Sequence, residues 1–297
     1  MKFNNLTLKK ELSYELMLLP ALLGYLVFFV YPVISSFVMS MTDWHIARQQ
    51  TSFIGLDNFV RLFQDEEILG GMKNSILYAV LMTIIQNILA VPLAVALDRK
   101  LKSKNLLRMV FFSPAVLSIL VVGYLWSFIM SPTDYGLLNQ VVQIFGAEKV
   151  NWLGDENIAL ISVLATQVWQ WTGWAMVIYV ANLQGIPKDH YEAATIDGAN
   201  SWQTFWKITL PQLFPSFTFN LVMSMIGGLK VFDVVYAMTN GGPGHATETI
   251  TIVLLKRAFT EGEFGLACAF SVVFFALIMV ISMIQVKYLQ RWEDSVV

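Results

Sequence analysis

The chain has 297 residues, of which 56% are hydrophobic and 13% are charged, and its mean hydropathy is +0.60. Soluble domains usually carry about 25% charged residues, so this chain lacks the charge to cover a water-facing surface in the ordinary way. The net charge of −2 gives no argument for a nucleic-acid partner, and a single cysteine, Cys268, excludes an intramolecular disulfide framework. The composition predicts one domain, residues 1–297, formed by a bundle of membrane-spanning helices.

Stretches without Asp, Glu, Lys or Arg predict the membrane spans, because a bilayer core needs roughly 20 apolar helical residues. Only helices satisfy their own backbone hydrogen bonds in lipid, so each stretch is expected to be a helix. Six stretches of at least 22 residues meet this requirement: 16–42, 74–97, 109–133, 157–187, 208–229 and 264–286. The first is too long for a cleaved signal peptide, and we expect it to be retained.

The distribution of Lys and Arg predicts the orientation. With the N-terminus inside, twelve of the nineteen basic residues fall in cytoplasmic segments. The densest cluster, residues 99–108, lies in a short loop, where the positive-inside rule is most reliable. Six spans then place both termini and the loop between the fourth and fifth spans in the cytoplasm.

That loop, residues 188–211, is a polar segment between two apolar runs, and its sequence predicts a stiff elbow of two helices. Pro187 limits continuation of the fourth span, and residues 189–197 are good helix material that Gly198 can terminate. Ser201 is expected to cap a second helix. One face of that helix carries three aromatic side chains, Trp202, Phe205 and Trp206. The residues by themselves favour an amphipathic connector at the membrane interface.

A resemblance changes that interpretation. Residues 192–211 have the spacing E-A-A, three residues, G, nine residues, I-x-L-P, which resembles the EAA loop of permease subunits in binding-protein-dependent ABC importers. Three further segments resemble sugar-importer permeases: Tyr31-Pro32, residues 42–44 with 55–59, and residues 240–249. The resemblance covers nearly the whole chain and is closest to the maltose and glycerol-phosphate permeases of the carbohydrate-uptake class.

The resemblance implies an all-α bacterial inner-membrane permease without catalytic residues. It implies a second homologous permease, two cytoplasmic ATPase subunits and an extracytoplasmic sugar-binding protein as partners; a heterodimer of permeases is expected, and a homodimer is left open. The chain contains no G-x-x-x-x-G-K-[ST] motif, so ATP and Mg²⁺ are expected on the partner ATPase and no cofactor on this chain. Residues assigned to ATPase coupling are Glu192, Ala193, Ala194, Asp197 and Gly198.

Polar and aromatic groups inside the fourth and fifth spans predict the substrate path, because intramembrane polar groups usually face the bundle interior. Sugars are bound by hydrogen bonds to their hydroxyls and by aromatic faces against their C–H surfaces. The candidates are Gln170, Gly173, Trp174, Asn220, Ser224 and Gly228. The resemblance implies that Ser224 and Gly228 are contact positions. Helix–helix packing is the competing explanation, and Lys230 and Asp233 are expected to snorkel or to pair with each other.

Other functions have less support. His45, His190 and His245 are scattered without an acidic companion in the sequence, so no metal site is expected. Gln86 and Asn87 are candidates for lining the pathway, but hydrogen bonds between helices explain them more simply. An ion-coupled secondary transporter of a small polar solute is the alternative function, but the six spans contain no Asp or Glu, which argues against proton coupling. The sugar itself is not identified by the sequence.

Overall fold

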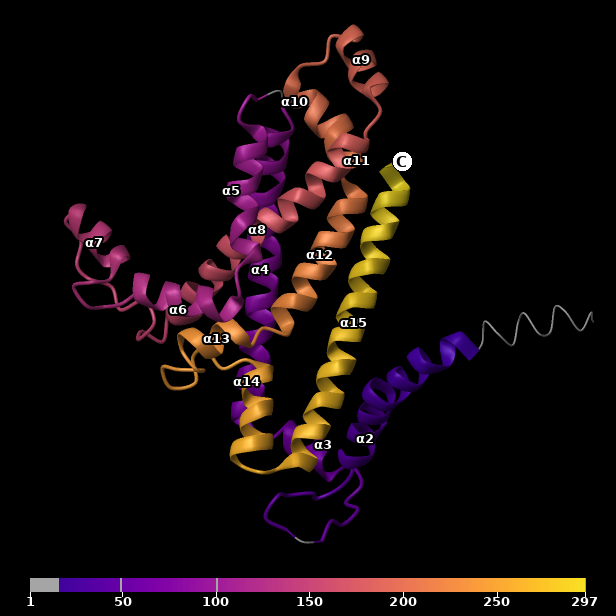
Figure 1. The fold of residues 1–297 in the computed structure, drawn as a ribbon, viewed down its shortest axis with the longest axis vertical. Coiled ribbons are helices and arrows are strands. Elements are labelled where there is room, and N and C mark those ends of the chain that lie inside the picture. The colour runs from indigo at the N-terminus through magenta and orange to yellow at the C-terminus, as the bar shows by residue number, and fades with distance from the viewer. Residues whose placement is uncertain (1–15, 49, 100, 297) are drawn as a thin grey trace, which may run out of the picture. The chain divides into compact units, whose positions relative to one another are not determined.

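Helices form all the extended regular structure in the computed structural model, which describes residues 16–48, 50–99 and 101–296 (Figure 1). Within these residues, strand pairing is limited to one isolated bridge between Thr42 and Phe53. The chain divides into two compact units, Met1–Gln64 with Leu254–Phe275, and Asp65–Val253 with Ala276–Val297. The prediction of an all-helical protein is therefore confirmed.

The first unit holds a long apolar helix and the polar segment that follows it. The helix runs from Leu16 to Met39 and contains η1 (Leu26–Val30) and α2 (Tyr31–Met39). The polar segment folds around Asn58, whose buried side-chain amide donates to the carbonyl oxygens of Ser40 and Thr42 at 2.9 and 2.8 Å. The rest of the unit is the short helix α3 (Asp57–Leu62), η3 (Lys256–Thr260) and the first part of α15 (Phe264–Val296).

The second unit is built around three helices that pack together, α4 (Glu66–Asp98), α8 (Ala159–Gly185) and α12 (Phe214–Leu229). Asp65 caps α4 by accepting from the backbone N–H groups of Glu67 and Ile68, as expected for an acidic N-cap. The remaining helices are α5 (Lys104–Val116), α6 (Ile119–Ile129), α7 (Leu137–Ile144), α9 (Lys188–Ile196), α10 (Ser201–Thr204), η2 (Phe205–Thr209), α11 (Leu210–Gln212), α13 (Asp233–Met238) and α14 (Ile250–Leu255).

Two buried clusters hold α4 against α8. One lies toward α13 and includes Tyr78, and the other lies toward α9 and includes Leu97. The close approach of α4 to α12 depends on Gly228 of α12, because a Cβ atom there would lie 2.6 Å from the Cα atom of Ala79 on α4. Small residues at such crossings let two backbones approach, which is how helices pack in lipid.

The expectation of one continuous helix over residues 109–133 is corrected. The structure has two helices there, α5 and α6, which are bent by 98° about Leu117 and Ser118. Both residues have extended backbone (ψ 146° and 133°), so the hydrogen-bond ladder stops. Pro114 lies one turn earlier and has no N–H to donate, which weakens the helix at this point.

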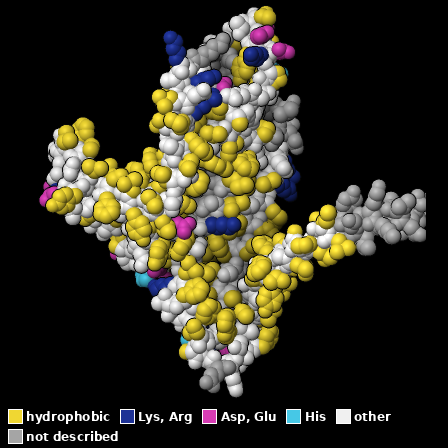
Figure 2. Space-filling view, in the orientation of Figure 1, with side chains coloured by type: hydrophobic (Ala, Val, Ile, Leu, Met, Phe, Trp, Pro, Cys, Tyr) yellow, Lys and Arg dark blue, Asp and Glu magenta, His cyan; other side chains and the backbone are white. Residues whose placement is uncertain are grey.

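Three described helices are long and apolar enough to cross a membrane, Leu16–Met39, Glu66–Asp98 and Phe264–Trp292, and the bent pair α5–α6 raises the number to four. These coincide with the first, second, sixth and third predicted spans. The fifth, 208–229, is divided into η2, α11 and the 16-residue α12, while α8 matches the fourth within two residues at each end. Hydrophobic side chains cover much of the surface of the second unit, and several Lys and Arg side chains lie at the end that holds α9 (Figure 2).

Candidate functional site

A cavity of about 300 Å³ opens between α4, α8 and α12 in the second unit. Each of the three helices contributes one face of regularly spaced residues, for example Tyr78, Met82 and Gln86 at intervals of four on α4. The full lining is Tyr78, Met82, Gln86, Ile119, Gln167, Trp171, Trp174, Met223, Ser224, Gly227, Gly228, Lys230, Val231, Phe232, Asp233 and Val234.

The polar groups in this lining are held in fixed orientations. The amide nitrogen of Gln86 donates to the carbonyl oxygen of Trp171 at 3.0 Å, which leaves its Oε1 atom buried and without a hydrogen-bond partner among the described residues. The hydroxyl of Tyr78 is likewise buried without a described partner. Both residues line the cavity, but these two atoms have almost no accessible surface, so they lie inside its wall and not on the surface that a ligand would touch.

Aromatic rings form another side of the cavity. Trp171 and Trp174 meet edge to face, with their ring centroids 6.3 Å apart, and Trp174 also lies 6.2 Å from Phe219. These contacts hold the indole rings in place. A polyhydroxylated ring with an apolar face would find both aromatic surface and hydrogen-bonding groups here.

Two charged side chains lie at the end of the cavity where α12 stops. Lys230 caps the C-terminus of α12, and Asp233 begins α13 after a two-residue break. Both line the cavity, and the described residues include no ion pair between them. Of the two expected roles, pairing is therefore not found, because neither residue lies within α12, which ends at Leu229, and snorkelling stays a prediction.

Three of the residues predicted for the substrate path line the cavity: Trp174, Ser224 and Gly228. The other three pack between helices. Gln170 is fully buried and donates to the carbonyl oxygen of Leu117, and Asn220 donates to that of Ala175 at 3.4 Å. Gly173 lies against α5, where a Cβ atom would be 1.8 Å from the carbonyl oxygen of Phe111.

Tyr78 and Gln167 were not predicted from the sequence, and for Gln86 packing was preferred over a place along the pathway. For Gln167, the sequence did contain an indication in the form of helical spacing. Gln167, Trp171 and Trp174 recur at i, i+4 and i+7 on the fourth span, which places them on one helical face. The sequence alone did not say that this face meets the face of α4 that holds Tyr78 and Gln86.

The residues predicted for ATPase coupling lie on and just after α9, beyond the ends of α8 and α12 (Figure 1). Glu192, Ala193 and Asp197 are exposed, and Ala194 is buried at 7% exposure. Gly198 follows with φ +74°, a left-handed conformation that glycine adopts without cost. One face of α9 is therefore not covered by any described residue. It consists of Glu192, Ala193, Asp197 and Ile196, whose side chain is 86% exposed.

The capping residue of the next helix differs from the prediction. Asn200, not Ser201, caps α10: its side chain accepts from the backbone N–H of Gln203, whose own side chain accepts from the backbone N–H of Asn200. This reciprocal pair is a capping box. It follows Gly198 directly, so a rigid turn joins the two helices.

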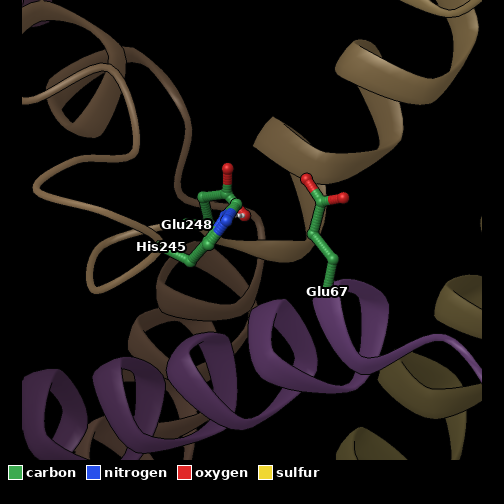
Figure 3. Close-up of side chains that lie close together, drawn as sticks. All are labelled: Glu67, His245 and Glu248. Carbon is green, nitrogen blue, oxygen red and sulfur yellow. Dashed lines mark hydrogen bonds and ion pairs between the residues drawn. The ribbon is translucent and has the colours of Figure 1, made fainter.

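One group of side chains in the second unit has the composition of a metal site. The ligand atoms of Glu67, His245 and Glu248 lie within 4.8 Å of one another, and His245 Nδ1 lies 2.8 Å from Glu248 Oε2 (Figure 3). Thus His245 does have acidic neighbours: Glu248 lies three residues further along the sequence, and the fold brings Glu67 near from 178 positions away. The His245–Glu248 ion pair accounts for two of the three groups, and the absence of a metal stays a prediction.

The segment that carries His245 is fixed by neighbouring helices. The side-chain nitrogen of Asn74 on α4 is within 3.0–3.3 Å of the carbonyl oxygens of His245, Ala246 and Glu248. Thr249 donates to the carbonyl oxygen of Val231, next to the cavity. The segment 240–249 is therefore a loop, and its last residues are buried and tied to the end of α12.

Comparison with known proteins assigns the chain to a family. The family described as the binding-protein-dependent transport system inner membrane component matches residues 68–294. The chain belongs to this family. The permease is 37% identical to the probable ABC transporter permease protein YurN of Bacillus subtilis (strain 168), over 94% of this chain and 97% of that protein.

Two further comparisons agree. The permease is 34% identical to the probable starch degradation products transport system permease protein AmyD of Thermoanaerobacterium thermosulfurigenes, over 96% of each chain. A bacterial alginate ABC transporter, solved in complex with its alginate pentasaccharide-bound periplasmic protein, contains a chain with a TM-score of 0.84 and 22% identity, covering 94% of each chain. That structural likeness establishes the fold alone. Membership of the family makes this chain a permease subunit and not an enzyme, with ATP hydrolysis on a partner ATPase.

Proposed function

We propose that this permease passes a sugar or oligosaccharide from an extracytoplasmic binding protein through the membrane into the cytoplasm. The observation that supports this best is the cavity between α4, α8 and α12. It combines the ring faces of Trp171 and Trp174 with the polar side chains of Gln86 and Gln167, which suits a ligand with hydroxyl groups on an apolar ring. The name of the AmyD relative refers to starch degradation products, which have this chemistry.

The proposal includes one transmembrane domain of six spans, with both termini and residues 188–211 in the cytoplasm. The basic cluster at residues 99–108 favours this orientation. Segments that are broken or short in the structure, α5–α6 and α12, are assigned as spans together with α8. Broken helices are compatible with lipid where neighbouring helices satisfy the freed backbone groups.

In the proposed mechanism α9 docks on a cytoplasmic ATPase subunit and transmits its movement to the helices. The exposed positions 192, 193, 197 and 198 and the uncovered Ile196 support this assignment. A second, homologous permease completes the path, and two ATPase subunits bind the ATP. The periplasmic protein in the alginate transporter complex is the precedent for the binding protein.

The test is uptake by the reconstituted system. This chain, its partner permease, the ATPase subunits and the loaded binding protein are placed in liposomes with ATP inside, and entry of a labelled malto-oligosaccharide series is measured. We expect uptake that requires ATP and the binding protein and that vanadate abolishes. Uptake by this chain alone, driven by an ion gradient, would favour the secondary-transporter alternative and contradict the proposal.

A further inference from the structure

Arg108, in the second turn of α5, joins the ends of three helices near α9. Its Nη2 atom donates to the carbonyl oxygen of Leu97 at 2.8 Å and lies 3.5 Å from Oδ1 of Asp98. Leu97 and Asp98 are the last two residues of α4. The Arg108 side chain is 20% exposed, so the guanidinium is largely shielded from solvent.

The third helix is α8, through Gln184. With its amide oxygen turned toward Arg108, Gln184 accepts from Nη1 at 3.1 Å and from Nη2 at 3.2 Å. This orientation gives both Nη atoms of Arg108 an acceptor on Gln184, while the buried Nε atom has no hydrogen-bond partner among the described residues. Gln184 is the penultimate residue of α8 and is followed closely by Pro187, the N-cap of α9. Arg108 therefore links α4 and α5 to the end of α8 from which α9 begins.

The chemistry of this junction is specific to arginine. The last carbonyl groups of a helix have no partner within the helix, and a cation near them is favourable. The planar guanidinium presents several donors in a fixed fork and can reach acceptors on different helices together, whereas the ammonium of lysine is a compact point charge. A lysine at position 108 would keep the charge but not the geometry.

Apolar packing extends the junction to α9. Leu97 of α4 and Leu183 of α8 belong to one buried cluster, and Tyr191 of α9 packs against that cluster. The hydroxyl of Tyr191 also lies 3.3 Å from Oγ1 of Thr209, which ties α9 to η2. Displacement of α9 thus acts on the ends of α4 and α8 at the place where Arg108 holds them together.

We propose that Arg108 is a positioning residue for energy coupling: it holds the ends of α4, α5 and α8 together, so that a movement of α9 shifts these helices as one body. Because α4 and α8 also line the cavity, moving them together changes the cavity, whereas a loose junction absorbs the movement. This inference rests on the proposed importer function and adds to it a residue outside both the cavity and the docking segment.

The experiment compares transport stoichiometry in the reconstituted complex. For Arg108→Ala and Arg108→Lys, ATP hydrolysis stimulated by the loaded binding protein and uptake of labelled sugar are measured in the same liposomes. We expect sugar transported per ATP to fall by about five-fold or more, the lower end of typical allosteric couplings. Lys102→Ala, which removes an exposed charge from the same basic segment, is the matched control and should keep the wild-type ratio.

If the Arg108 variants do not assemble, variants of Gln184 test the same junction from the side of α8. Gln184→Leu removes the acceptor and should lower the ratio, whereas Gln184→Glu keeps an acceptor for the guanidinium and should preserve it. An unchanged ratio in Arg108→Lys and Gln184→Leu overturns the inference. If the wild-type complex shows no ATP-dependent uptake, the importer function fails first, so the two failures are distinguishable.

Discussion

The side-chain amide of Gln170 donates to the main-chain carbonyl oxygen of Leu117 at 3.1 Å, where the α5–α6 pair bends by 98°. Extended backbone at Leu117 leaves this carbonyl without its helical donor. In lipid, an unpaired backbone group is costly, and a side chain from a neighbouring helix can satisfy it. Gln170 therefore stabilises the broken helix from α8.

Replacing Gln170 by methionine removes this hydrogen bond with little change in shape. We expect a loss of about 1–2 kcal/mol in the free energy of unfolding, because the carbonyl oxygen of Leu117 loses its side-chain donor. The measurement is equilibrium unfolding of the purified permease in mixed detergent micelles.

Thr172→Val is the matched control on the same helix. Its hydroxyl donates to the carbonyl oxygen of Val168 at 2.6 Å, within α8, so its loss does not affect another helix. Equal destabilisation by both variants would contradict a special role for Gln170.

Gln86→Leu tests the polar wall of the cavity. The variant removes the amide group that Gln86 contributes to the lining and its hydrogen bond to the carbonyl oxygen of Trp171, and we expect the KM for sugar uptake to rise roughly ten-fold, the equivalent of about 1.4 kcal/mol. Uptake is measured against the concentration of sugar-loaded binding protein in the reconstituted system.

Thr83→Val, one turn earlier on α4, provides the comparison. The Thr83 hydroxyl donates to the carbonyl oxygen of Ala79 at 2.7 Å in its own helix, and Thr83 does not line the cavity. Its KM should stay close to the wild-type value. A Gln86→Leu variant with unchanged uptake would remove Gln86 from the binding site.

Gly198→Asp is expected to leave assembly in the membrane largely intact while uncoupling ATP hydrolysis from uptake. No atom lies within 4 Å of a Cβ placed at Gly198, so the fold has room for the side chain. The backbone φ of +74° at this position is unfavourable by about 1 kcal/mol for a residue with a Cβ atom. The carboxylate would lie on the uncovered side of the turn.

Gly198→Asn adds a similar volume without the charge, and asparagine tolerates this backbone conformation. We expect it to lose less uptake than the aspartate variant. Co-purification with the ATPase, ATP hydrolysis and uptake are measured for both. Normal uptake by Gly198→Asp would count against the docking role of α9.

Gly173→Ala should disrupt the contact between α5 and α8. Its Cβ atom would lie 1.8 Å from the carbonyl oxygen of Phe111, a backbone atom that cannot move independently. Forced separation of packed helices typically costs about 1–3 kcal/mol or more. A lower melting temperature and a smaller yield of monodisperse protein are expected.

Gly185→Ala is the control at the end of the same helix, because no atom lies within 4 Å of its Cβ position. It should melt like the wild-type protein. If Gly173→Ala is equally stable, α5 and α8 have more freedom to separate than the structure indicates.

The sequence was informative wherever one helix or one short motif was enough. Long runs without charge predicted the helices Leu16–Met39 and Glu66–Asp98, because exclusion of charge from lipid acts on each segment alone. The EAA spacing indicated the positions of α9 and of the turn at Gly198, because the whole pattern lies within 20 consecutive residues, 192–211. The family assignment bears out this resemblance.

The sequence failed where the outcome depended on contacts between distant segments. A substrate-path role and a packing role for Gln170 were equally compatible with its place in an apolar helix. Only the break at Leu117, 53 residues away, gives its amide a specific partner. In the same way, the fold brings Glu67 close to His245 from a distant part of the sequence.

By itself, the sequence determined that this is a helical membrane permease with a polar segment between two apolar runs, since hydropathy and short motifs are properties of consecutive residues. Only the tertiary structure decided which polar side chains face the cavity and which bind other helices. A buried amide takes whichever partner the neighbouring backbone leaves unsatisfied, and that partner is set by how the helices bend and cross.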